Sequence, residues 1–394
     1  MTSDANARRN AMILAVAQAL YSSTTIILFS TGGLVGLMLA ENRAWATLPI
    51  SAFVIGTMIT TIPASFLMRR FGRVPGFLTG SGFGLAGALL SLAAIWIASF
   101  PLFCAACLLQ GGFQGFSQYF RFAAADAASD EFRPKAISWV LTGGIVAAIM
   151  GTVIVMNTAD LFAPLTFAGC YAASAALAIA TAITVLFLDI PKPSAAKALG
   201  ENRPWAVLLR QPRLVAAMAS GTLSYAIMNL MMTATPIAMF DCGFGKNESF
   251  WVIQWHVLAM FVPSFFTGNL IKRFGAAPVC LAGAVILACA GVVALTGISF
   301  AHFAVALILL GLGWNFGFIG GTTLLTECYK PAERAKVQAA NDFSISAAMA
   351  IASLSSGKLL GYFGWDSVAY ALLPMAAVAA ALLIWGNAKR ALPA

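Results

Sequence analysis

The feature that most constrains this chain is a series of apolar runs, each of about 20 residues, recurring from one end of the sequence to the other. A run of that length crosses a hydrocarbon core of roughly 30 Å as an α-helix. Hydrophobic residues make up 60% of the chain and charged residues only 9%, against roughly 25% charged in a soluble protein. The alternating pattern of a membrane barrel is missing, and a backbone in lipid must satisfy its own hydrogen bonds. The sequence therefore predicts an all-α membrane protein.

Polar breaks between the apolar runs predict twelve transmembrane helices in two six-helix bundles. The first six spans are expected at residues 11–40, 46–68, 76–98, 101–125, 137–158 and 164–188. The second six are expected at residues 214–240, 249–271, 277–298, 302–327, 338–360 and 367–387. Residues 1–188 would form the N-terminal bundle and residues 214–394 the C-terminal bundle. The polar segment 189–213 would join them as a cytoplasmic linker.

The distribution of basic residues supports this topology. With both termini inside, cytoplasmic segments hold all of the 23 Lys and Arg residues except Arg43, Arg121, Lys246 and Lys358. One span more or fewer would invert half of the loops and destroy this asymmetry. The bias also explains the net charge of +9 without nucleic acid as a partner. We expect a multi-pass protein of the bacterial inner membrane, with the lipid bilayer as its partner and no cleaved secretory peptide.

Two loops recur at equivalent positions in the two halves. Residues 65–72 follow the second span and residues 268–275 follow the eighth, 203 residues later. Residues 126–135 and 327–336 follow the fourth and tenth spans at an offset of 201. The first pair resembles the Gly-x-x-x-Asp-Arg-x-Gly-Arg signature of the major facilitators, although Arg69 and Lys272 stand where that family has its acidic residue. The resemblance implies the major facilitator fold, with a substrate site near the membrane midplane between the halves.

A set of soft ligands is predicted on the seventh and eighth spans. His256 lies roughly 10 Å of helical rise inside the eighth span, one turn before Met260. Met228 and Met232 lie one turn apart on the seventh span. If these antiparallel spans meet, three thioethers and one imidazole converge, and such ligands select Cu(I). The alternative is that these Met residues only fill the apolar core.

The paired motif, Met228-x-x-x-Met232 with His256-x-x-x-Met260, resembles that of the bacterial CcoA copper importers. Residues 313–327 and 330–336 are also similar to that group, and residues 313–327 are shared with importers of other solutes, including riboflavin. The resemblance implies that the chain imports copper by alternating access for assembly of cbb3-type cytochrome oxidase, with hand-off to cytoplasmic copper carriers. It also implies that the four residues are the metal ligands. Copper would be the substrate, and no cofactor is expected.

Three cysteines extend the metal hypothesis. Cys242, beside Asp241 just outside the seventh span, is a candidate for first capture of copper or an incidental loop thiol. Cys104 and Cys107 lie within one helical turn in the fourth span. They would bind a soft metal together or pack as small residues between helices.

Several polar residues inside the spans are candidates for gating or for lining a cavity. Arg121 in the fourth span should face a cavity or pair with Asp126. Gln110, Gln114 and Gln118 share one face of the same span, and Asn315 lies in the tenth. Together with the nine Trp residues, these polar side chains support an alternative function. The chain would then import or export a small organic solute such as riboflavin or a drug. The sequence has no phosphate-binding glycine loop, so we do not expect an enzyme. It also predicts no extramembrane domain that could transmit a signal, which argues against a membrane sensor.

Overall fold

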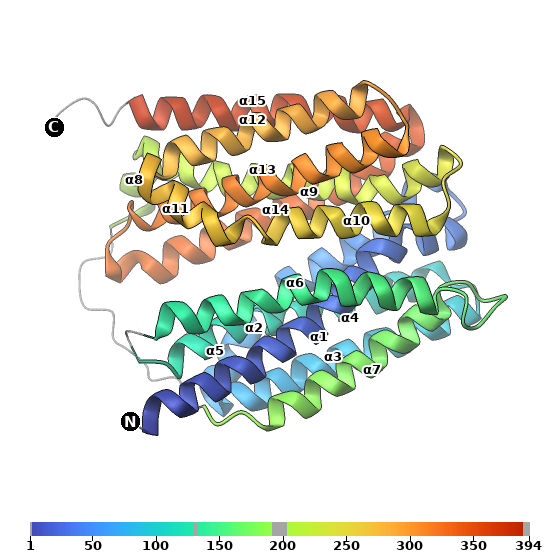
Figure 1. Ribbon diagram of the computed structural model, residues 1–394, viewed down its shortest axis with the longest axis horizontal. Coiled ribbons are helices and arrows are strands. Elements are labelled where there is room, and N and C mark those ends of the chain that lie inside the picture. Colours follow the sequence, from blue (N-terminus) through green and yellow to red (C-terminus); the bar gives the residue numbers. More distant parts are fainter. Residues whose placement is uncertain (1, 130–131, 191–202, 389–394) are drawn as a thin grey trace. The chain divides into compact units, whose positions relative to one another are not determined.

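The computed structural model describes residues 2–129, 132–190 and 203–388, which form α-helices joined by short loops (Figure 1). The chain divides into two compact units, Met1–Ala195 and Ala196–Ala394. Each unit is a helical bundle, so the predicted all-α fold class is confirmed. Of the predicted linker 189–213, residues 191–202 lie outside the described residues.

The first unit begins with a 38-residue helix and ends with a 19-residue helix. Its elements are α1 (Thr2–Leu39), η1 (Arg43–Trp45), α2 (Leu48–Phe71), α3 (Arg73–Trp96), α4 (Phe100–Ser117), α5 (Phe120–Asp126), α6 (Arg133–Thr158) and α7 (Ala168–Leu186). Gly72, with a φ of 101°, ends α2 in a conformation that residues with a side chain rarely adopt. This break allows α3 to begin at the next residue.

The second unit repeats this order after one short helix. Its elements are α8 (Trp205–Leu208), α9 (Pro212–Asp241), α10 (Lys246–Phe261), α11 (Ser264–Phe274), α12 (Ala276–Leu295), α13 (Phe300–Thr326), η2 (Pro331–Glu333), α14 (Arg334–Phe363) and α15 (Trp365–Ala388). Gly275, with a φ of 90°, separates α11 from α12 as Gly72 separates α2 from α3. The recurring loops of the sequence therefore form the same kind of break in both units.

The helices also pack in the same order in both units. In the first, α1 packs against α6 and α7, α4 packs against α2 and α3, and α3 packs against α7. In the second, α9 packs against α14 and α15, α13 packs against α10 and α12, and α12 packs against α15. The two units are therefore two copies of one helical arrangement.

Small residues bring some of these helices into close contact. A Cβ atom added to Gly111 of α4 would overlap the carbonyl oxygen of Phe53 on α2. A Cβ atom on Gly317 of α13 would overlap the hydroxyl of Ser224 on α9. Beside it, Ser220 donates a hydrogen bond to the Gly317 carbonyl at 2.9 Å. Van der Waals packing of this kind holds helices together in lipid, where the hydrophobic effect between them is weak.

Ten helices in the described part of the chain are long and apolar enough to cross a membrane. The number is eleven when α10 and α11, which meet at a bend of 40°, count as one broken span. The chain is therefore a multi-pass membrane protein. The remaining predicted span, 101–125, consists of α4 and α5; α4 has only 18 residues, and Gln110 and Gln114 reduce its apolar character.

Candidate functional site

The break between α10 and α11 is held by one buried amide from α13. Asn315 is fully buried, and its Nδ2 donates to the Met260 carbonyl and to Ser264 Oγ, both at 2.7 Å. Thr267 Oγ1 donates to Asn315 Oδ1 at 2.6 Å. Pro263 lies at the bend and has no N–H to continue the helical ladder. Asn315 therefore fixes a helix break and does not line the hydrated cavity expected from sequence.

His256 is fully buried on the face of α10 that packs against α13. Its Nδ1 lies 2.8 Å from the carbonyl oxygen of Leu307. Because a carbonyl oxygen only accepts hydrogen bonds, Nδ1 carries the hydrogen and Nε2 presents a lone pair. Nε2 has no hydrogen-bond partner among the described residues. This tautomer is the one that can ligate a metal or accept a hydrogen bond from a substrate.

The three predicted Met ligands are also buried. Met228 and Met232 belong to α9, which packs against α13, α14 and α15, and Met260 belongs to α10 beside Gly311 of α13. Their convergence with His256 on one ion stays a prediction. Among the residues with described side chains, no three His, Cys, Asp or Glu side chains gather as a metal site. Burial raises the pKa of the Cys242 thiol, which disfavours the thiolate that first capture of copper would use.

An aromatic cluster joins three helices of the second unit. Trp314 and Phe318 of α13 stack with ring centroids 5.2 Å apart and an interplanar angle of 17°. Tyr225 of α9 meets both rings edge-on, at 5.1 and 5.0 Å, and Phe261 of α10 lies 6.3 Å from Trp314. Trp314 is buried, whereas the other three are half-buried, so the cluster reaches the surface of the unit. Such a surface can stack against a planar conjugated ring.

Sequence reasoning counted the Trp residues but did not identify this cluster. Trp314 and Phe318 are four residues apart and so share a helix face, which is a usable signal. Their partner Tyr225 lies on another helix, and nothing in the sequence indicates that contact.

The charged residues of the first unit are arranged differently from the prediction. Arg73, the first residue of α3, donates to Asp126 Oδ2 from Nε at 3.2 Å and from Nη2 at 2.5 Å. Asp126 is therefore the partner of Arg73, and of the two expectations for Arg121, facing a cavity or pairing with Asp126, the pairing is not found. Arg73 reaches Asp126 because the helix break at Gly72 places Arg73 at the start of α3, next to the end of α5. The Arg121 guanidinium lies 4.8 Å from the ring centroid of Phe122, and its Nε has no hydrogen-bond partner in the described part of the chain.

The glutamine face of α4 is only partly open. Gln110 is buried and donates to Ser91 Oγ of α3 at 3.0 Å. Gln114 and Gln118, on the following turns, are half-buried and remain candidates for contact with a solute.

On the same helix Cys107 is buried and Cys104 half-buried, and both thiols are free. A metal on this pair stays a prediction.

A buried carboxylate anchors the chain before α8 to the loop between α13 and α14. Glu333 accepts from Arg203 Nε at 2.6 Å and from Arg203 Nη2 at 2.7 Å, and also from the Lys330 N–H at 2.9 Å. The Arg203 guanidinium lowers the pKa of Glu333 to about 2. The carboxylate is therefore ionised throughout the physiological range, and the ion pair fixes the loop.

Two sequence comparisons bear on the identity of the chain. The family model described as Major Facilitator Superfamily matches residues 11–262 and 218–393. The riboflavin transporter RfnT of Brucella anthropi is 44% identical over 388 residues, which cover 98% of this chain and 97% of that protein. The uncharacterised MFS-type transporter YddS of Bacillus subtilis is 29% identical over 373 residues, covering 89% and 85%.

Solved structures of other transporters have the same fold. The nucleoside transporter NupG superposes with a TM-score of 0.72 and 15% identity, covering 98% of this chain and 100% of that one. The POT family transporter PepTSo superposes with a TM-score of 0.73 and 12% identity, covering 96% and 97%. At these identities the likeness concerns the fold alone.

Proposed function

This chain belongs to the Major Facilitator Superfamily, and on that premise we propose that it imports riboflavin, or a planar organic solute of the same class, across the bacterial cytoplasmic membrane. The observation that carries this proposal is the 44% identity to a riboflavin transporter along almost the whole chain. The comparisons favour this organic solute over the copper implied by the sequence motif. Both termini would lie in the cytoplasm, as the distribution of basic residues predicts.

The aromatic cluster is the feature of the second unit that suits such a substrate. The isoalloxazine ring of riboflavin is flat and conjugated, and Tyr225, Phe261 and Phe318 present half-buried aromatic surface. Stacking of one aromatic pair contributes about 0.5–1.5 kcal/mol beyond the burial of its area. Trp314 stacks beneath Phe318 and fixes its orientation. We therefore assign Phe318 and Tyr225 as candidate contacts to the ring and Trp314 as their support.

Growth of a riboflavin auxotroph on limiting vitamin tests this proposal. Cells that express the chain should grow where cells without it do not. Phe318→Ala should raise the half-saturating riboflavin concentration about fivefold, the equivalent of one lost stacking contact. Trp96→Ala is the matched control, because Trp96 is 73% exposed at the end of α3 in the other unit. Absence of growth with the unaltered chain, at normal levels in the membrane, would rule the proposal out.

Cu(I) is the second candidate substrate. It is favoured by the buried Nε2 of His256, which has no partner among the described residues and lies one turn from the thioether of Met260. Inward movement of one positive charge gains roughly 2.3 kcal/mol per 100 mV of inside-negative potential, so no coupling ion is required. Single changes to Leu at Met228, Met232, His256 and Met260 should each abolish uptake of radioactive copper. Unchanged uptake in all four variants would exclude this site.

A further inference from the structure

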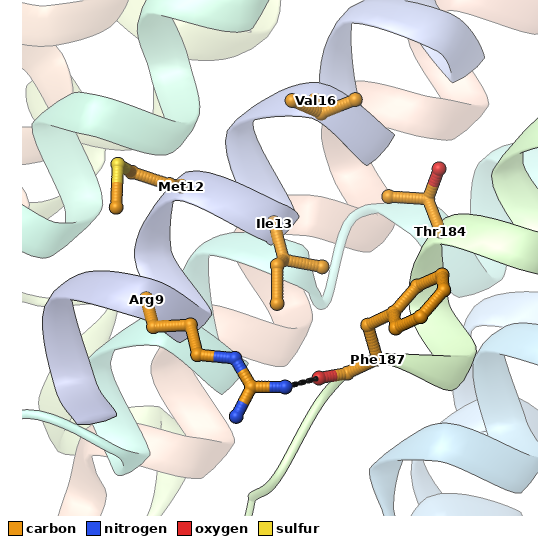
Figure 2. A pocket seen from close by; sticks show the side chains of 6 residues that line it. All are labelled: Arg9, Met12, Ile13, Val16, Thr184 and Phe187. Atoms are coloured by element: carbon orange, nitrogen blue, oxygen red, sulfur yellow. Dashed lines mark hydrogen bonds between the residues drawn. The ribbon is translucent and has the colours of Figure 1, made fainter.

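A groove on the first unit runs between the start of α1 and the end of α7 (Figure 2). Its volume is about 390 Å³, and its walls are Arg9, Met12, Ile13 and Val16 of α1 with Thr184 and Phe187 at the end of α7. Figure 2 shows the Arg9 guanidinium beside Phe187, and Met12 and Val16 on successive turns of α1 beyond it. The groove therefore has one cationic end and an apolar body.

The apolar body of the groove is open to its surroundings. Met12, Val16 and Phe187 are 54%, 53% and 60% exposed. Val16 lies seven residues beyond Arg9, which corresponds to roughly 10 Å along the helix axis. Arg9 precedes the apolar run of α1, which begins near residue 11. The groove therefore begins outside the apolar run and continues along it.

The cationic end retains capacity to bind an anion. Arg9 is exposed and, among the described residues, donates one hydrogen bond, from Nη2 to the Phe187 carbonyl at 3.2 Å. A guanidinium has five N–H donors, so others remain for a ligand. Asp189 is an acidic residue near this end, and its carboxylate accepts a hydrogen bond from Asn6 at 3.1 Å. Asn10 binds the Asp189 backbone carbonyl at 2.7 Å, which fixes the chain as it leaves α7.

We propose that this groove binds an anionic phospholipid of the cytoplasmic leaflet. The phosphate would lie on Arg9, since guanidinium and phosphate form charge-assisted bidentate pairs. One acyl chain would lie along Met12, Ile13 and Val16, covering apolar surface that is otherwise exposed. A free anion would leave that surface uncovered, and a zwitterionic lipid would have a weaker attraction to Arg9. Basic pockets on the cytoplasmic side of helical membrane proteins commonly hold such headgroups.

Native mass spectrometry of the purified full chain tests the proposal. Phosphatidylglycerol and phosphatidylcholine with identical acyl chains are titrated separately, and the wild-type protein should retain the anionic lipid preferentially. Arg9→Gln should weaken that retention on the order of fivefold, the effect of one basic residue at an anionic surface. Arg8→Gln is the matched control, because it makes the same charge change while its guanidinium lies 5.7 Å from the Phe132 ring centroid. It should behave as the wild type.

A second variant and a competitor complete the experiment. Val16→Trp should obstruct the acyl chain and reduce retention of the anionic lipid although the charge at Arg9 is unchanged. Glycerol phosphate, which has the headgroup anion without the chains, should not displace the lipid at equal concentration. Equal losses in Arg9→Gln and Arg8→Gln would show a diffuse surface charge and overturn the proposal. Displacement by glycerol phosphate, or no preference for phosphatidylglycerol in the wild type, would overturn it as well.

Discussion

Replacing Asn315 by alanine tests the buried hydrogen bonds that hold the second unit together at its helix break. The change removes three bonds, those to the Met260 carbonyl, Ser264 Oγ and Thr267 Oγ1. All three partners belong to α10 or α11, whereas Asn315 belongs to α13. The loss therefore separates two elements of the bundle and leaves polar groups without partners in an apolar setting.

The expected magnitude follows from the number of bonds. Hydrogen bonds between transmembrane helices contribute about 0.6 kcal/mol on average and at most about 1.7 kcal/mol. Three bonds therefore give a loss of about 2 kcal/mol in the free energy of unfolding, with an upper bound of about 5 kcal/mol. A loss of about 2 kcal/mol lowers the folding equilibrium constant by roughly 30-fold.

Equilibrium unfolding of the full chain in mixed detergent micelles measures this quantity. Asn157→Ala is the matched control, since Asn157 is exposed and, within the described ranges, binds only the Val153 carbonyl of its own helix, at 2.7 Å. The control should lie within about 0.5 kcal/mol of the wild type, as surface changes usually do. If Asn315→Ala unfolds as the wild type does, or no earlier than the control, the assigned role of Asn315 is refuted.

Two further predictions concern the ion pair and the helix packing. The pKa of Glu333 is lowered from 4.5 to about 2 by Arg203, so its stabilisation is complete above pH 4.5 and is lost as the pH falls toward 2. The melting temperature should therefore decline across that window in the wild type and decline less in Glu333→Gln, and equal slopes would contradict the role of the pair. Gly111→Ala should cost about 1–3 kcal/mol through overlap with the Phe53 carbonyl, because well-packed contacts do not accept added atoms. Gly82→Ala, where nothing lies within 4 Å of the added carbon, should cost nothing in the same unfolding assay, and equal costs would contradict this packing.

Much of the fold could be predicted because the membrane limits the choices. Apolar runs predicted the spanning helices, and the recurring loops at residues 65–72 and 268–275 form the same glycine break in both units. The bend at Pro263 was missed because it lies inside an apolar run that reads as one span, 249–271. The pairing of Asp126 with Arg73 was missed because those residues are 53 positions apart and meet through tertiary packing.

The candidate site was less predictable, for a similar reason. The sequence places His256 deep in an apolar span, where an ionisable group requires a protein environment, and the structure shows it buried. Its partner, the backbone carbonyl of Leu307, lies 51 residues away, and any residue type would supply the same atom. The aromatic cluster depends on contacts among three helices, and amino-acid types alone do not indicate which faces meet. Sequence therefore predicted candidate side chains better than their partners.

Substrate uptake into vesicles reconstituted with the purified chain distinguishes riboflavin from copper as the transported solute. Radioactive riboflavin and radioactive Cu(I) are offered separately, with empty vesicles as the blank. We expect saturable riboflavin uptake that excess unlabelled riboflavin abolishes and that Phe318→Ala weakens about fivefold. Uptake of copper without uptake of riboflavin, lost in His256→Leu, would show that copper is the substrate and that riboflavin is not.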